Sequence, residues 1–174
     1  MEFLELCKKR YSVRDFSSVK VEEEKLSKIL EAGRLSPTAK NSQSHRIFVL
    51  KSDAALEKIR RATPMAYNAP LVLLVCYDSR ESYKNPADTV CVNYDGGEVD
   101  AAIVGASMMY QATERGLGTL WARGFDSAKI IDAFSLPPEL RVVCLLDIGY
   151  AADSSMPSER HFLRKNLSET VKEL

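Results

Sequence analysis

Residues 70–77 read PLVLLVCY, an uninterrupted apolar run that ends at a polar, turn-rich stretch. An apolar run of this length without alternation is typical of a strand that is buried on both faces of its sheet. Residues 141–150, RVVCLLDIGY, have the same character. These two segments predict the interior of a sheet, and the helical segments around them indicate the class of fold.

Two segments with a helical repeat stand out on either side of the first strand. Residues 21–35 have an acidic first turn and one apolar face, made of Val21, Leu26, Ile29, Leu30 and Gly33. The longest helix is expected at residues 98–115, where small or apolar residues on most faces predict burial nearly all round. Gly105 and Ala106 would let another helix approach closely, either within one domain or from a second subunit.

Shorter segments complete the pattern. Helices are expected at residues 2–9, 53–61, 126–134 and near 167–174, and strands at 46–51 and 119–125. The order α, α, β, α, β, loop, α, β, α, β, tail implies one sheet flanked by helices, although spacing does not give the order of its strands. We expect residues 1–174 to form one domain, with the irregular residues 78–97, which hold Tyr83 and Tyr94, as a candidate lid over a site.

Composition argues against several classes of protein. The 24 basic and 24 acidic residues cancel, so bulk charge does not favour nucleic acid as a partner. No apolar run is long enough to span a membrane, and the first ten residues lack the apolar stretch of a signal peptide, so we expect a cytoplasmic protein. The four cysteines have no C-x-x-C spacing and there are only two histidines, so no metal site is expected.

Residues 10–16, RYSVRDF, are the first candidate for a binding function. In an extended chain Arg10, Ser12 and Arg14 project to the same side. Two guanidinium groups and a hydroxyl on one side suit a phosphate, which arginine can bind with two parallel hydrogen bonds. The plainer alternative is a solvated basic stretch that continues from Lys8 and Lys9.

Two further segments carry polar groups in suggestive positions. Residues 36–46, SPTAKNSQSHR, connect a helix to a strand and offer several hydroxyl and amide groups, although polar turns are common. Residues 116–126, GLGTLWARGFD, contain a Gly-x-Gly, but the glycines follow a helix and precede a strand, and no third glycine completes a Rossmann fingerprint. Asp100, Asp126 and Asp147 are expected to be helix caps or surface groups, and His45 and His161 have no visible partners for a catalytic triad.

The three segments, in this order and spacing, resemble the nitroreductase family over nearly the whole chain. The resemblance implies a nitroreductase-like α+β fold, with a central mixed, mainly antiparallel sheet flanked by helices. It implies an intertwined homodimer in which each of two FMN sites takes residues from both chains. The implied cofactor-binding residues are Arg10, Tyr11, Ser12, Arg14, Pro37, Thr38, Ala39, Asn41, Gln43, Leu120, Trp121, Arg123, Gly124 and Arg160.

Within that set the resemblance assigns different parts of the cofactor to different residues. The phosphate and ribityl chain fall to Arg10, Ser12 and Arg160, with Arg164 as the second candidate in the tail. The backbone of Arg123 and Gly124 would face the flavin N5, and no side chain is needed as a catalytic acid or base. Arg123 departs from the apolar, small or acidic residues common at its position.

The implied activity is that of an FMN-dependent NAD(P)H oxidoreductase that reduces nitro compounds, quinones or related small-molecule acceptors by ping-pong hydride transfer. Other interpretations stay open at this point. They are a flavoenzyme of the same fold with other chemistry (reductive dehalogenation or dehydrogenation), a flavin-binding protein without turnover, and a dimeric interaction module without a cofactor. The physiological acceptor and the choice between NADH and NADPH cannot be derived from the sequence.

Overall fold

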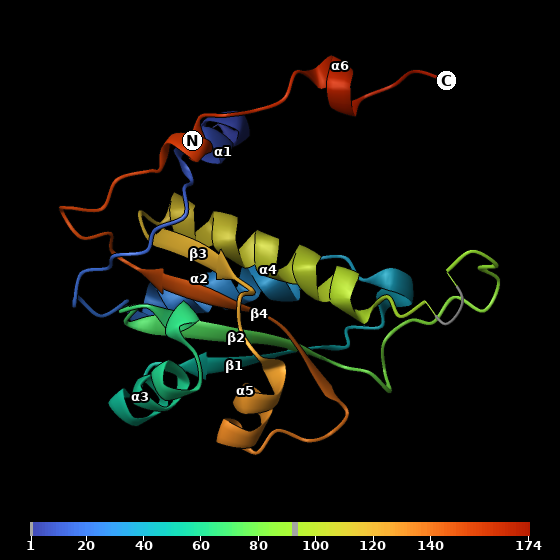
Figure 1. Ribbon diagram of the computed structural model, residues 1–174, viewed down its shortest axis with the longest axis horizontal. Helices are drawn as coiled ribbons and strands as arrows, with labels where there is room; N and C mark the ends of the chain where they lie inside the picture. The colour runs from blue at the N-terminus through green and yellow to red at the C-terminus, as the bar shows by residue number, and fades with distance from the viewer. Residues whose placement is uncertain (1, 92–93) are drawn as a thin grey trace.

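The computed structural model describes residues 2–91 and 94–174 and contains a four-stranded sheet at its centre (Figure 1). The strands are β1 (His45–Leu50), β2 (Leu71–Asp78), β3 (Gly118–Ala122) and β4 (Leu140–Gly149), in the spatial order β1-β2-β4-β3. All three pairs of neighbouring strands are antiparallel. A single parallel bridge, between Ser12 and Thr119, adds the N-terminal segment to the β3 edge. The mainly antiparallel α+β sheet expected from the sequence is confirmed.

The helices follow the predicted order and lie within a few residues of the predicted bounds. They are α1 (Phe3–Lys9), α2 (Glu23–Arg34), α3 (Asp53–Ala62), α4 (Gly97–Glu114), α5 (Ser127–Phe134) and α6 (Leu167–Thr170). Ser52 caps α3 by accepting a hydrogen bond from the Ala55 amide at 3.3 Å, and Asp126 caps α5 through the Ala128 amide at 3.0 Å. Asp126 is therefore a helix cap, as expected. Within the described residues no helix is both long and apolar enough to cross a bilayer.

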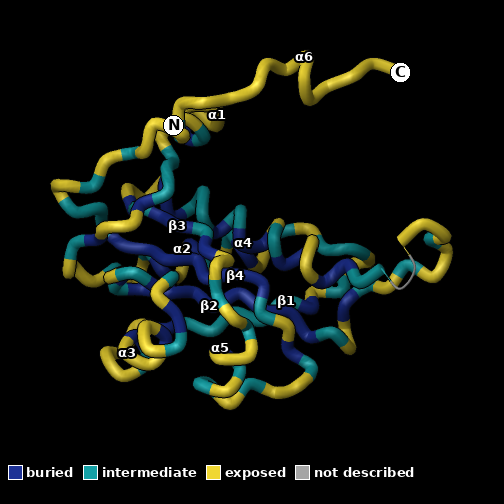
Figure 2. The backbone as a smooth tube through the Cα atoms, viewed as in Figure 1, coloured by how far each residue is buried: buried dark blue, intermediate teal, exposed yellow. Residues whose placement is uncertain are grey.

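The sheet separates two apolar layers, which explains the uninterrupted apolar run of β2. Alternate side chains of a strand point to opposite faces, so Leu73 packs toward α2 and α4 while Leu74 packs toward α3 and α5. All eight residues of β2 are buried. Figure 2 shows the buried residues running through the sheet and the helices beside it, whereas α6 and the chain around it are exposed.

Helix α4 packs on the sheet but is not buried all round. Its apolar residues Val99 and Ile103 are 50% and 39% exposed, and Ala106 and Tyr110 continue the same stripe half-buried. This stripe is not covered within one chain, and its burial by a second subunit stays a prediction. The Trp121 ring of the same chain packs against Gly105. A Cβ at this position would lie only 2.5 Å from that ring.

Asp147 contradicts the expectation of a cap or surface group. It lies in β4 opposite Val72 and Leu120, is 0% exposed, and faces the layer of α3 and α5. Neither oxygen of its carboxyl has a hydrogen-bond partner in the described part of the chain. Burial raises the pKa of Asp147 to about 8, although Arg60 acts in the opposite direction.

Residues 78–97, the candidate lid, project from the end of β2 (Figure 1); residues 92 and 93 lie outside the described residues. The segment is tied down where it returns to α4. There the Asp95 carboxylate accepts a hydrogen bond from Tyr77 Oη at 3.2 Å and forms an ion pair with Lys84 Nζ at 2.6 Å. Tyr83 and Tyr94, the two aromatic residues expected in the lid, are half-buried.

Candidate functional site

The four arginines named as candidates for binding the cofactor, Arg10, Arg14, Arg160 and Arg164, converge on one cavity. The cavity has a volume of about 230 Å³ and is lined by Arg10, Ser12, Arg14, Ser158, Arg160, His161 and Arg164. The structure therefore brings together the N-terminal segment and the tail, and it places Arg160 and Arg164 in the same cavity. We call it the arginine cavity.

The N-terminal wall of the arginine cavity is an extra strand segment on the edge of the sheet. Ser12 bridges Thr119 of β3, and the Val13 amide donates a 3.0 Å hydrogen bond to the Thr119 carbonyl. Val13 is buried against Gly118, where a Cβ would lie 2.7 Å from a Val13 methyl carbon. Because Val13 points into the core, its neighbours Ser12 and Arg14 point outward.

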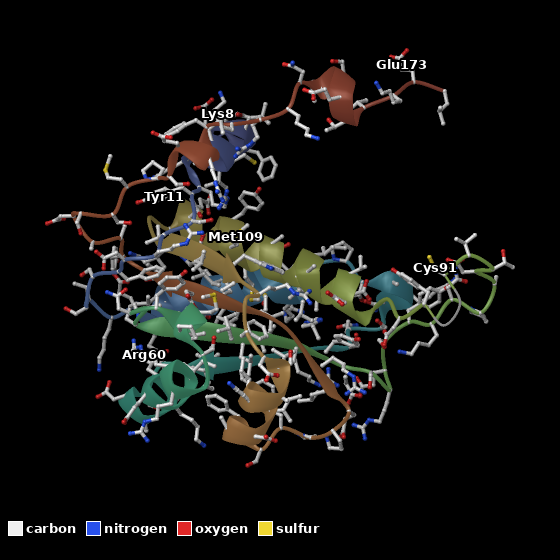
Figure 3. The ribbon with its side chains drawn as sticks, in the orientation of Figure 1. Lys8, Tyr11, Arg60, Cys91, Met109 and Glu173 are labelled. Atoms are coloured by element: carbon white, nitrogen blue, oxygen red, sulfur yellow. The ribbon has the colours of Figure 1, made fainter. Side chains whose placement is uncertain are left out.

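The tail closes the cavity by running back along the same segment. Ser17 donates its amide to the Tyr150 carbonyl at 2.8 Å, and Ala152 donates its amide to the Asp15 carbonyl at 3.0 Å. Tyr11 Oη then donates to the Ser155 carbonyl at 3.3 Å. Figure 3 shows Tyr11 near α1, with Cys91 at the opposite end of the molecule. These contacts bring Arg160, from the far end of the sequence, to Arg10.

The charge in the cavity is uncompensated, as a site for an anion requires. No salt bridge to Arg10, Arg14, Arg160 or Arg164 is formed among residues 2–91 and 94–174. Within the described part of the chain, Arg14 and Arg164 donate only to backbone carbonyls. Guanidinium groups that lie close together without a carboxylate repel one another, and a bound anion would offset this repulsion. The residues present therefore fit a phosphate group.

Sequence reasoning missed Ser158 and His161 as residues of this cavity. His161 Nε2 lies 3.1 Å from the Lys8 carbonyl oxygen, and the His161 ring packs edge-on against the rings of Tyr11 and Phe162. The only signal in the sequence was that both residues neighbour Arg160.

At the other end of β3 lie the residues expected beside a flavin ring. Arg123 and Gly124 are exposed, and Arg123 forms an ion pair with Glu98 in the first turn of α4. A Cβ at Gly124 would meet Met65 Sδ at 3.1 Å. The Leu120 side chain is buried toward α3 and α5, and the half-buried Trp121 packs on α4, so only the backbone of Leu120 is available to a ligand.

Residues 36–43, within the connection between α2 and β1, have an unusual backbone, and we call them the recognition loop. Lys40, Asn41 and Gln43 all have positive φ, at 54°, 54° and 48°, and all three are exposed. Left-handed backbone is unfavourable for residues with a Cβ and collects at functional sites. The loop is held from inside by Asp100 of α4, and Asp100 is 4% exposed. Asp100 is therefore not a surface group, and the expectation was wrong for it.

Helix α4 separates the recognition loop from the other predicted site residues. Glu98, which pairs with Arg123, and Asp100, which holds the loop, are two residues apart and therefore about 200° apart around the helix. Arg10 shares a small cavity with Thr113 near the C-terminal end of α4, about 20 Å along the helix from Asp100. One chain thus brings together Arg10, Ser12, Arg14 and Arg160 but keeps Thr38, Asn41 and Gln43 apart from them.

Fold and cavity together define a class of protein: an α+β protein with a cavity lined by four arginines beside the edge of a small antiparallel sheet. A sequence profile of the nitroreductase family matches residues 7–64 and 60–150. The chain therefore belongs to the nitroreductase family, as the three sequence segments predicted. Members of this family use a flavin and are generally homodimers, and membership makes the chain an oxidoreductase of the nitroreductase type.

Individual relatives agree with this assignment. A protein of Methanothermobacter thermautotrophicus, provisionally named NADH dehydrogenase/NAD(P)H nitroreductase, is 28% identical over 161 residues, which cover 88% of this chain and 80% of the relative. The crystal structure of a nitroreductase family protein from Clostridium difficile 630 has a TM-score of 0.90 at 39% identity, covering 99% of this chain and 98% of that one. A structure from Exiguobacterium sibiricum 255-15, provisionally identified as a nitroreductase and solved with FMN, has a TM-score of 0.82 at 21% identity, covering 100% and 98% of the two chains, and shows likeness of fold alone.

Proposed function

We propose that the protein is a homodimeric FMN-dependent NAD(P)H oxidoreductase that reduces nitro compounds, quinones or related small-molecule acceptors in two successive half-reactions. The observation that carries this proposal is the arginine cavity, in which Arg10, Arg14 and Arg160 have no carboxylate partner among the described residues. The membership of the chain in a flavin-using oxidoreductase family supports it.

In this proposal the residues of the cavity bind the cofactor at its charged end. Arg10, Arg160 and the Ser12 hydroxyl would hold the phosphate and the ribityl chain, and Arg14 would favour a negatively charged reduced ring. Arg123 and Gly124 would border the ring with their backbone. FMN supplies the hydride chemistry when bound, and the protein binds and orients the reactants. Solvent can supply protons, so no side chain is assigned as an acid or base.

The position of the recognition loop supports a homodimer. Because α4 stands between the loop and the arginine cavity, Thr38, Asn41 and Gln43 could complete a site only on a second copy of the chain. The stripe of exposed Val99 and Ile103 and half-buried Ala106 and Tyr110 has the spacing of a helix that packs on another helix. The α1 helix and the tail also expose Phe3, Phe162 and Leu163, each at least 60% exposed. These apolar surfaces suit a partner of the same chain.

An absorbance experiment tests the proposal. The purified protein, as isolated or after incubation with FMN, should show a flavin spectrum that is bleached by anaerobic NADH or NADPH and restored by a quinone or a nitroaromatic compound. Protein that cannot be loaded with FMN would refute the cofactor assignment. Bound flavin that neither nucleotide reduces would support a flavin-binding protein without turnover instead.

A further inference from the structure

We infer that Asp100 is a positioning residue for cofactor binding, which fixes the recognition loop in the shape that it presents to the partner subunit. The inference rests on the proposed function, because it concerns the loop that the proposal assigns to the partner's cofactor. It adds a residue that lies outside every segment from which the site was predicted.

The contacts of Asp100 run to both ends of the tight turn in the loop. The Ala39 amide donates to Asp100 Oδ1 at 3.0 Å and to Oδ2 at 3.1 Å, and the Ser42 hydroxyl donates to Oδ2 at 3.3 Å. Between these two residues lie Lys40 and Asn41, both with left-handed backbone. One carboxylate therefore closes the segment that contains the unfavourable conformations.

Burial makes these contacts strong and difficult to replace. Asp100 is 4% exposed and lies in the first turn of α4, where the helix dipole favours a negative charge. Hydrogen bonds to a charged acceptor are about twice as strong as those between neutral groups. An asparagine has one acceptor oxygen in place of two, so it could keep only part of the arrangement.

The exposed face of the loop indicates that its shape serves binding. The side chains of Lys40, Asn41 and Gln43 are exposed, so the left-handed backbone is not offset by apolar burial of these residues. The remaining contacts inside the loop are local: the Gln43 amide donates to Thr38 Oγ1 at 3.1 Å, and Gln43 Nε2 donates to the Asn41 carbonyl at 3.4 Å. Asp100 links this loop to α4, and Arg46 Nη1 of β1 adds a hydrogen bond to the Gln43 carbonyl at 3.2 Å.

The first test compares Asp100→Ala, Asp100→Asn and the control Ser52→Ala in full-length protein. Ser52→Ala removes the cap of α3 and lowers stability without touching the loop or the arginine cavity. We expect the FMN dissociation constant to rise at least about tenfold in Asp100→Ala and by an intermediate factor in Asp100→Asn, with no change in the control. Amide hydrogen exchange in a peptide covering residues 36–44 should become faster in Asp100→Ala than in wild type, and should stay unchanged in the control.

The possible results distinguish a failure of the role inferred for Asp100 from a failure of the proposed FMN-dependent function. If wild-type protein binds no FMN, the proposed function fails and the inference fails with it. If wild type binds FMN and all three variants bind it equally well, only the inference is overturned. Unchanged exchange of the 36–44 peptide in Asp100→Ala would likewise overturn it, because Asp100 would then not hold the loop.

A mixed dimer tests whether the loop acts on the partner's site. One protomer carries Arg10→Ala and the other carries Asp100→Ala, each with a different affinity tag. If the loop acts across the interface, one of the two sites combines an intact Arg10 with an intact Asp100, and about half of the sites should bind FMN with wild-type affinity. If neither site recovers, the loop acts within its own chain and this part of the inference is wrong.

Discussion

Replacing Asp147 with asparagine should stabilise the protein increasingly as the pH rises. The carboxyl of Asp147 is fully buried without a hydrogen-bond partner in the described part of the chain, and its pKa is raised to about 8 from an ordinary value of 3.8. Between these values the folded state holds a proton that the unfolded state has lost. Stability therefore falls as pH rises through this window, because the folded state binds more protons.

The magnitude follows from the width of the window. Each unit of pKa difference corresponds to about 1.4 kcal/mol, so a rise of about four units makes the ionisable carboxyl cost roughly 5–6 kcal/mol above pH 8. An asparagine side chain at this position would have nearly the same shape and no proton to lose. Its amide stays buried and unpaired, so the absolute stability of the variant is less informative than the change with pH.

Urea unfolding of wild type and Asp147→Asn at several pH values between about 5 and 8 measures the effect. The free energy of unfolding of the variant minus that of wild type should grow by about 1.4 kcal/mol per pH unit. Both proteins are compared at the same protein and FMN concentrations, because binding and dimerisation shift apparent stability. Titrations of other groups cancel in the difference as long as they do not interact with residue 147.

A difference that stays constant over this pH range would refute the reasoning. It would mean that Asp147 has an ordinary pKa in the folded state and therefore has partners or solvent. Asp147→Leu provides a second check, since it removes the polar group and should be more stable than wild type at about pH 7.5 if the site accepts its volume.

Three further predictions concern the site and its surroundings. Arg10→Ala should weaken FMN binding by roughly 1.5–3 kcal/mol in a fluorescence titration, and an unchanged dissociation constant would remove Arg10 from the site. Burial alone would raise the pKa of Asp95, but hydrogen bonds led by that from Lys84 outweigh it and lower the pKa to about 2. Wild type should thus be more stable than Asp95→Asn, with the full difference present above about pH 4 and lost as the pH falls toward about 2. Thermal unfolding of both proteins at several pH values measures this difference. Phenylalanine or alanine at Tyr83 and Tyr94 should alter KM for at least one acceptor, and identical kinetics for every substrate would contradict a lid.

The class of fold was predictable because the decisive signals are local. The apolar run around Leu73 and Leu74 indicates a strand covered on both faces, and the spacing of Leu26, Ile29 and Gly33 indicates one buried face of a helix. The order β1-β2-β4-β3 was not predictable, because it depends on pairings between strands far apart in sequence. Asp147 was misjudged for a related reason: its position inside an apolar strand pattern does not reveal what covers each face.

The candidate site was predictable to the extent that its residues share a segment. Arg10, Ser12 and Arg14 alternate along one extended stretch, so their common direction could be derived from the sequence. Arg160 was assigned to the site only through the resemblance, because the sequence carries no signal for the backbone pairing of the tail with residues 15–17 or for the hydrogen bond from Tyr11 Oη to the Ser155 carbonyl. Asp100 was missed because the amide that it holds, at Ala39, lies 61 residues earlier in the chain.

The first turn of α4 leaves little room for insertions or deletions. Glu98 and Asp100 point to opposite sides of the helix, one toward Arg123 and the other toward Ala39. A single inserted residue between them would rotate one carboxylate by about 100° relative to the other, and no shift of the helix could restore both contacts. The length of this turn should therefore tolerate far less variation than residues 84–91, which are mostly exposed.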